Sequence, residues 1–144
     1  MELLAADLED ARVLDLFAGT GALGLEALSR GAASVDFVEN HPAALHALKA
    51  NVAVVRARDR IRVFKKDAIP FVEALDEDAY DVVLADPPYG SRAADRVVRR
   101  WLEVAFAKTL AVEHATDHAL PAGGRRHPAG DSALTVFQVR RRSP

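Results

Sequence analysis

Short apolar runs alternate with longer amphipathic stretches over the first two thirds of the chain. Four runs rich in β-branched and aromatic residues predict strands over residues 12–17, 34–39, 60–64 and 80–85. Apolar residues spaced three or four apart predict helices over residues 21–30, 42–54, 68–75 and 93–105. Strands that alternate with helices of this length favour an α/β fold, in which helices cover both faces of a mostly parallel, twisted sheet.

The pattern changes after residue 105. Residues 109–113 and 133–139 are apolar and predict two further strands, and the segment 122–130 between them is rich in glycine, proline and arginine. Because no helix is expected between these strands, they predict an antiparallel pair at the far end of the sheet. We therefore expect a single domain over residues 1–139, followed by a disordered basic tail over residues 140–144.

Length and composition narrow the class of protein. The 144 residues are enough for one domain, which at this size buries roughly 70% of its unfolded surface. The chain has no cysteine, which excludes disulfides, thiolate metal sites and cysteine nucleophiles, and we expect no metal site. No apolar run approaches the roughly 20 residues of a spanning helix, and the acidic start is unlike a signal peptide, so we expect a cytoplasmic protein.

Charge is unevenly distributed, although the net charge is only −2. Residues 1–90 carry 9 Lys and Arg against 16 Asp and Glu, a balance of −7, whereas residues 91–144 carry 10 against 5, a balance of +5. A basic C-terminal part can meet a phosphate backbone. A solvated arginine-rich face explains the same charges equally well, so charge permits a nucleic-acid partner without identifying one.

A glycine-rich loop joins the first predicted strand to the first predicted helix. The stretch Gly19-Thr20-Gly21-Ala22-Leu23-Gly24 has the G-x-G-x-x-G pattern. Glycines let the backbone turn tightly and approach a ligand closely, and the helix that follows offers free N–H groups. A tight turn without any ligand remains the alternative for this motif alone.

Acidic residues at three strand ends extend this site. Glu39 follows Gly19 by 20 residues, where a carboxylate can accept both hydroxyls of a ribose; its alternative is a helix N-cap. Asp15 would repel a pyrophosphate but suits the ammonium of a methionine moiety. Asp67 can accept from the N6 amine of adenine, or cap the next helix. The residues beside these acids and within the loop complete the expected cofactor site: Phe17, Ala18, Thr20, Gly21, Asn40 and Ala68.

A rigid turn, Asp86-Pro87-Pro88-Tyr89, follows the fourth predicted strand directly. Two prolines fix the backbone, remove two N–H donors and leave carbonyl oxygens free to accept. Sites in open α/β sheets form beyond the carboxyl ends of strands, which is where this turn falls. A purely structural surface turn is the alternative.

The two motifs together resemble those of a known enzyme family. DLFAGTGALG and DPPY look like the amino-methyltransferases that act on nucleic-acid bases. The longer stretch LDLFAGTGALGLEALSRGA, with FVE and DPPYG, resembles more narrowly the RsmD-type guanine-N2 methyltransferases of 16S ribosomal RNA. The resemblance implies a Rossmann-like class I methyltransferase fold, S-adenosyl-L-methionine as cofactor, and ribosomal RNA or the small ribosomal subunit as partner. We expect a monomer.

The resemblance also implies roles for the rigid turn. The Asp86 carboxylate and the Pro87 carbonyl would accept hydrogen bonds from the exocyclic amine, which localises its lone pair and aims it at the methyl group. Tyr89, with Pro88, would stack on a base that has left its helix or loop. These four residues form the expected catalytic set, and no metal or covalent nucleophile is needed.

Several alternatives stay open. The family usually begins with an arginine-rich segment and an amphipathic helix, whereas this sequence reaches its first predicted strand within a few residues. A cofactor-binding domain without activity is therefore one alternative; adenine-N6 methylation of DNA and NAD binding are others. Residues 64–66 and 92–100 are candidate RNA contacts, although exposed charges at strand and helix ends explain them equally well. No catalytic role is expected for any histidine, and Trp101 is expected to pack on a helix face.

Overall fold

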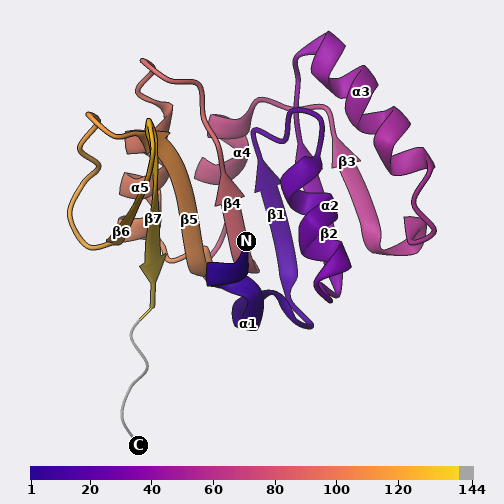
Figure 1. Cartoon of the computed structure of the whole chain (residues 1–144), viewed down its shortest axis with the longest axis horizontal. Helices are drawn as coiled ribbons and strands as arrows, with labels where there is room; N and C mark the ends of the chain where they lie inside the picture. The colour runs from indigo at the N-terminus through magenta and orange to yellow at the C-terminus, as the bar shows by residue number, and fades with distance from the viewer. Residues whose placement is uncertain (140–144) are drawn as a thin grey trace, which may run out of the picture.

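A seven-stranded sheet forms the centre of residues 1–139, the part of the chain that the computed structural model describes (Figure 1). Along the sheet the strands follow the order β3-β2-β1-β4-β5-β7-β6. Strands β1 to β5 are parallel, β7 is antiparallel to β5, and β6 is antiparallel to β7. In chain order the strands are β1 Arg12–Leu16, β2 Ser34–Val38, β3 Ile61–Phe64, β4 Tyr80–Ala85, β5 Ala107–Ala115, β6 Arg125–Ala129 and β7 Ser132–Gln138.

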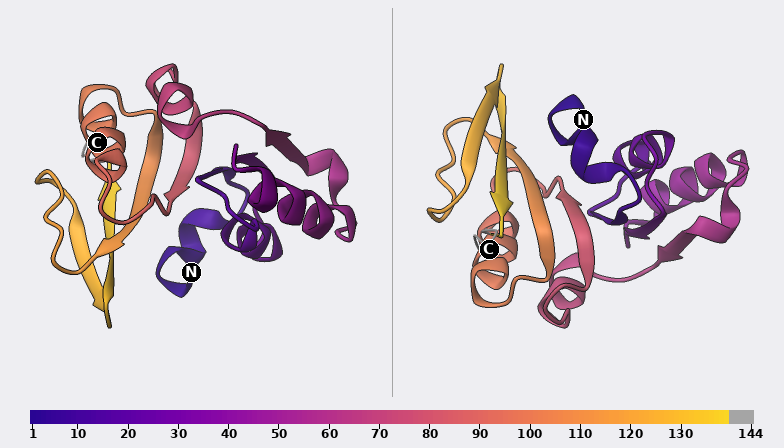
Figure 2. Two further views of the ribbon diagram at one scale, coloured as in Figure 1. Left: turned by 90° about the horizontal axis from the view of Figure 1, so that it is seen from above. Right: turned by 90° about the horizontal axis from the view of Figure 1, so that it is seen from below.

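Helices cover both faces of the sheet, as predicted, and Figure 2 shows the two layers from above and below. One face carries a short N-terminal 3-10 turn (η1, Glu2–Leu4), α1 (Ala5–Leu8), α2 (Ala22–Ser29) and α3 (Pro42–Ala53). The other face carries α4 (Ala68–Glu73) and α5 (Ala93–Glu103). A further 3-10 turn, η2 (Arg58–Arg60), leads into β3.

The period-two geometry of the strands divides the core into two clusters. Successive side chains of a strand point to opposite faces. In β1, Val13 packs beneath α2, whereas Leu14 and Leu16 belong to the cluster beneath α4 and α5. In β4, Val82 faces the first cluster and Val83 the second, and all five side chains are buried. Central strands buried on both faces explain why these stretches are almost continuously apolar.

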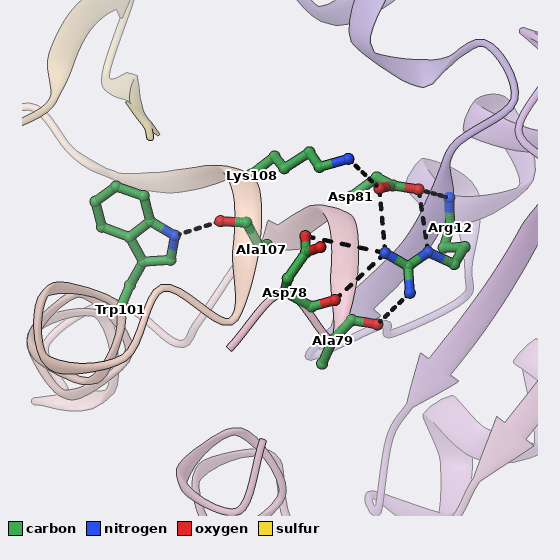
Figure 3. Close-up of polar contacts among 7 residues, drawn as sticks. All are labelled: Arg12, Asp78, Ala79, Asp81, Trp101, Ala107 and Lys108. Carbon is green, nitrogen blue, oxygen red and sulfur yellow. Dashed lines mark hydrogen bonds and ion pairs between the residues drawn. The ribbon is translucent and has the colours of Figure 1, made fainter. Parts of the chain in front are cut away.

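Charged residues pin the amino ends of the parallel strands together (Figure 3). The Arg12 guanidinium at the start of β1 donates to the Asp81 carboxylate of β4, with Nε 3.2 Å from Oδ2, and Lys108 Nζ of β5 lies 3.3 Å from Asp81 Oδ1. Burial alone would raise the pKa of Asp81, but the hydrogen bonds from Arg12, then Lys108, outweigh it and hold the pKa below 3.8. At the start of β5, Trp101 Nε1 of α5 donates to the Ala107 carbonyl at 2.8 Å, and the Trp101 side chain is buried, which confirms its predicted packing role. These ion pairs therefore tie β1, β4 and β5 together at their amino ends, opposite the carboxyl ends at which the motifs lie.

The predicted elements agree with the structure within two residues at most ends, and β4 agrees at both. Strand β5 is longer than expected, and its antiparallel pairing with β7 is confirmed. The segment 122–130, for which no strand was predicted, contains β6. The sequence pattern also did not predict η1 and α1, which precede β1. The predicted tail over residues 140–144 lies outside the described residues.

Strand β6 escapes sequence prediction for a physical reason. Its residues, RRHPA, are mostly exposed and include a proline, which sheets tolerate at an edge. As the edge strand it pairs with β7 alone. Backbone hydrogen bonds to β7, rather than burial of apolar side chains, define the strand, so no hydrophobic alternation marks it.

Candidate active site

The glycine loop makes a sharp turn at the carboxyl end of β1. Phe17, Gly19 and Gly21 all adopt positive φ angles, of 61°, 58° and 86°. Such a conformation costs a bulky residue like Phe17 about 1–2 kcal/mol, and costs glycine little. Ala18 N donates to the Val38 carbonyl of β2 at 3.0 Å, and exposed Thr20 accepts through its carbonyl from the side chain of Asn51 in α3. The loop is therefore held in a strained shape by its neighbours.

The three motif glycines serve different purposes. A Cβ on Gly24 would overlap the Phe37 ring and Val35 of β2, so this glycine lets α2 pack closely on the sheet. A Cβ on Gly21 would overlap the Leu48 side chain, in addition to its positive φ. A Cβ on Gly19 would meet nothing within 4 Å. Gly19 therefore faces open space, and its absent side chain leaves room for a ligand.

Glu39 fastens the glycine loop to the end of β2. Its carboxylate accepts from Gly19 N at 2.7 Å, Asn40 N at 3.0 Å and His41 N at 2.9 Å. The N-cap of α3 is His41, so the alternative that Glu39 caps this helix is wrong. Glu39 instead joins the loop to the strand end, at the place where the ribose-binding role was predicted.

Asp67 occupies the end of the neighbouring strand β3. It is the N-cap residue of α4, as the alternative predicted, although its side chain makes no capping hydrogen bond to that helix. Its carboxylate accepts from the side-chain amide of Asn40. This contact places the two polar side chains side by side at the carboxyl ends of β2 and β3.

A cavity of about 450 Å³ opens between these strand ends and the Asp-Pro-Pro-Tyr turn. This volume is within the usual range for small-molecule sites. Five of the ten predicted cofactor residues line it: Phe17, Glu39, Asn40, Asp67 and Ala68. The other five, which do not line it, are Asp15, Ala18, Gly19, Thr20 and Gly21, and Gly19 reaches the site through its bond to Glu39. Six further residues that line this cavity were not predicted for the cofactor site: Val38, His41, Lys66, Ile69, Pro70 and Pro88, of which Pro88 was predicted only as a catalytic residue.

Asp15 is buried beneath α2, with 1% of its surface exposed. Its Oδ2 accepts from Gly24 N at 2.9 Å, and so satisfies a free N–H group in the first turn of a helix whose N-cap, Gly21, has no side chain. Burial raises the pKa of Asp15 to about 7; the Gly24 N–H opposes this shift, and the negative charges of Asp86 and Glu39 add to it. Three carboxyl groups thus interact electrostatically at one edge of the sheet.

The Asp86-Pro87-Pro88-Tyr89 turn lies at the end of β4, the strand next to β1. Pro87 is buried, whereas the other three residues are exposed, and 56% of the Tyr89 surface is accessible. Ser91 Oγ donates to the Pro88 carbonyl at 2.7 Å and closes the turn. Partial burial raises the pKa of Asp86, and the negative charge of Glu113 raises it further.

A second, smaller pocket lies against the other side of this turn. Its walls come from the turn, from α5 and from the end of β5: Pro87, Pro88, Tyr89, Gly90, Ser91, Ala94, Glu113, His114, Ala115 and His118. His114 Nε2 lies 2.7 Å from Thr135 Oγ1, and His118 Nε2 lies 2.8 Å from Asp95 Oδ1. Glu113 was not predicted as a site residue, although it ends the predicted strand 109–113. Pro88 lines both this pocket and the larger cavity.

Residues 1–139 show neither a metal-binding cluster nor a helix that could span a membrane. That part of the chain contains no group of three or more His, Cys, Asp or Glu side chains that could hold a metal ion. Its helices also lack the combination of length and apolar character that crossing a lipid bilayer requires.

Similarity to known proteins agrees with this architecture. Ribosomal RNA small subunit methyltransferase D of Escherichia coli is 35% identical over 146 residues, which cover 94% of this chain and 72% of that protein. The solved structure of Escherichia coli yhhF superposes with a TM-score of 0.80 at 31% identity, covering 95% of this chain and 80% of that one. A tRNA1(Val) (adenine(37)-N6)-methyltransferase of Shewanella amazonensis is 38% identical over 77 residues, or 54% of this chain and 33% of that protein.

The sheet order and the antiparallel β5–β7 pair, together with these similarities, confirm the Rossmann-like class I methyltransferase fold. Residues 1–126 match the family model described as Conserved hypothetical protein 95. The chain therefore belongs to this family, the RsmD-type methyltransferases.

Proposed function

We propose that this protein transfers a methyl group from S-adenosyl-L-methionine to the exocyclic N2 amine of a guanine in small-subunit ribosomal RNA. The observation that carries the proposal is the position of Pro88, which lines both the larger cavity and the pocket beside Tyr89. A cofactor in the first and a base against the second would meet at the Asp86-Pro87-Pro88-Tyr89 turn. RNA as the substrate is inferred from the name of the Escherichia coli relative.

Charge favours this cofactor over a dinucleotide. Asp15, Glu39 and Asp86 take part in no ion pair with any residue in the range 1–139. When bound, S-adenosyl-L-methionine would supply a methyl group on a positively charged sulfur. The N–CH₃ bond would form as the S–CH₃ bond breaks, the sulfur would leave as a neutral thioether, and the amine would release a proton. Its sulfonium and ammonium charges complement the three carboxyl groups, whereas a pyrophosphate would be repelled.

The residues around the larger cavity suit an adenosine. Glu39 would accept from the ribose hydroxyls and Asp67 from the adenine amine, while Phe17 and Ile69 offer apolar surface to the ring. The open space over Gly19 leaves room for the rest of the molecule. Asp15, which caps α2, would act on the methionine ammonium through its charge, since it is almost fully buried.

The rigid turn would orient the base. The Asp86 carboxylate and the Pro87 carbonyl accept hydrogen bonds from the two amine hydrogens, and exposed Tyr89 stacks on the ring. The raised pKa of Asp86 makes its carboxylate a better acceptor for the proton that the amine loses. In-line positioning supplies most of the rate, on the order of 7–11 kcal/mol at best. Exposed Arg92, the N-cap residue of α5, and exposed Arg99 on α5 are available to the RNA backbone.

Kinetics and calorimetry of two variants test these roles. We expect Asp86→Ala to lower the single-turnover rate at saturating cofactor by about 10²–10³-fold and to change cofactor affinity less than that rate, because its hydrogen bond is made to the reacting amine. We expect Glu39→Ala to weaken cofactor binding and to keep most of that rate. Glu77→Ala, which removes an exposed carboxylate outside both cavities, is the control.

The substrates for this assay are naked 16S RNA, 30S subunits and DNA. Nucleoside analysis of the products separates N2-methylguanosine from N6-methyladenosine, the product of the tRNA methyltransferase of Shewanella amazonensis. If both variants lose only cofactor affinity, the roles given to Asp86 and Glu39 are wrong. N6-methyladenosine as the product would refute guanine as the target.

A further inference from the structure

Glu113 lies directly beside Asp86 at the carboxyl edge of the sheet. Val112 of β5 is paired with Ala85 of β4, and Glu113 and Asp86 are the next residues along these parallel strands. Neighbouring strands are about 4.8 Å apart, so the two carboxyl groups extend from adjacent positions. Glu113 is half-buried and lines two cavities: the pocket beside Tyr89, and one of about 210 Å³ whose walls include Leu84 and Leu134. It therefore borders the space in which the base would stack.

The other polar side chains of this pocket already have partners. The ring of His114 lies within hydrogen-bonding distance of Thr135 and of the Ala115 carbonyl, and the ring of His118 contacts Asp95. The Glu113 side chain makes no hydrogen bond or ion pair with any residue from 1 to 139. A half-buried carboxylate without a partner gains from any donor that enters the pocket.

The chemistry of the bases then distinguishes guanine from the other two bases with an exocyclic amine. In guanine the ring atom N1 beside the N2 amine carries a hydrogen and donates. In adenine and cytosine the ring nitrogen beside the amine carries a lone pair and accepts. A carboxylate only accepts hydrogen bonds, so it attracts the guanine edge and repels the other two.

We propose that Glu113 accepts the N1–H of the target guanine while Asp86 and Pro87 hold its N2 amine, and that Glu113 thereby selects guanine over adenine and cytosine. The inference rests on the proposed function. Its further support is the effect of the Glu113 charge on Asp86, whose pKa it raises, because only nearby charges interact in this way. Glu113 is a specificity residue: it does not contact the reacting nitrogen.

A change of one base in the RNA tests this role. The methylated position is first mapped in 16S RNA, and the target guanosine is then replaced by 2,6-diaminopurine, which keeps the 2-amine, carries an amine in place of the 6-oxygen and has an acceptor at N1. Nucleoside analysis counts methylation at the 2-amine alone. We expect the native protein to methylate the guanine RNA about 10- to 100-fold faster in single turnover. Glu113→Gln, which can donate to N1 of diaminopurine, should reduce this ratio to a few-fold or reverse it. Asp117→Asn, an exposed change in the loop after β5, should keep the native ratio.

The ratio of the two rates is measured within one protein preparation, so a partly unfolded variant still gives a valid result. Calorimetry with S-adenosylhomocysteine confirms that the Glu113→Gln variant retains its cofactor site. Methylation of guanine with a ratio that Glu113→Gln leaves unchanged would overturn the role of Glu113 and leave the proposed function intact. Methylation of neither RNA by the native protein, or of adenine in its place, would overturn both.

Discussion

Replacing Asp15 by Asn should stabilise the protein above neutral pH. The pKa of this buried carboxyl is raised from 3.8 to about 7, first by desolvation. Between these values the folded state holds a proton that the unfolded state has lost, so stability falls as pH rises from about 4 to about 7. Above that range the cost of ionising Asp15 reaches on the order of 4 kcal/mol. An Asn side chain keeps an acceptor for Gly24 N and carries no charge.

The measurement is urea unfolding near pH 5 and near pH 8, followed by the fluorescence of Trp101, which is buried and is the only tryptophan. Between these two conditions we expect the Asn variant to gain about 2–3 kcal/mol relative to the native protein. The contributions of all other titratable groups are common to both proteins and cancel in the difference.

Asp15→Ala provides the matched control. It removes the same charge but also leaves Gly24 N without its acceptor, which costs about 1–3 kcal/mol at every pH. Its stability should therefore run parallel to that of the Asn variant and below it. Stability curves for the native protein and the Asn variant that stay parallel from pH 5 to pH 8 would show that Asp15 ionises normally and would refute the argument.

Three further outcomes follow from the same structure. Cofactor affinity should rise between about pH 6 and pH 8 in calorimetry, because the cationic ligand favours ionised Asp15. Asp15→Asn should abolish this rise, and an affinity of the native protein that does not depend on pH would contradict the prediction. Gly24→Ala should lower the free energy of unfolding by about 1–3 kcal/mol through its clash with Phe37, whereas Gly19→Ala should lower cofactor affinity more than stability. If the two variants lower stability and cofactor affinity by the same amounts, the separate roles given to these glycines are wrong. Asp81→Asn should lower the free energy of unfolding by about 1–2 kcal/mol at pH 7, and by less as pH falls below 4, because the lowered pKa of Asp81 makes its carboxylate stabilising only above that range. Free energies of unfolding of the two proteins that fall in parallel on acid titration would refute this.

The elements of the fold could be predicted from the sequence where burial in the core requires apolar side chains along the element. Strands β1, β2 and β4 are buried on both faces, and their mostly apolar runs, each with one aspartate, predict them without knowledge of their neighbours. Strand β6 could not be found in this way, because its only partner is β7 and its side chains are mostly exposed. The N-terminal turns η1 and α1 were missed because they are short and become helical only where Leu4 and Leu8 pack on the sheet.

The sequence by itself determined which residue types stand at the carboxyl ends of β1, β2, β3 and β4, because motif spacing and strand ends are local properties of a chain. Only the tertiary structure decided how these strand ends meet. It turned Asp15 beneath α2 and away from the surface, joined the Glu39 carboxylate to the glycine loop, and placed Glu113, which follows 27 residues later in the sequence, beside Asp86. Strand order sets these contacts across long stretches of sequence, so no local pattern contains them.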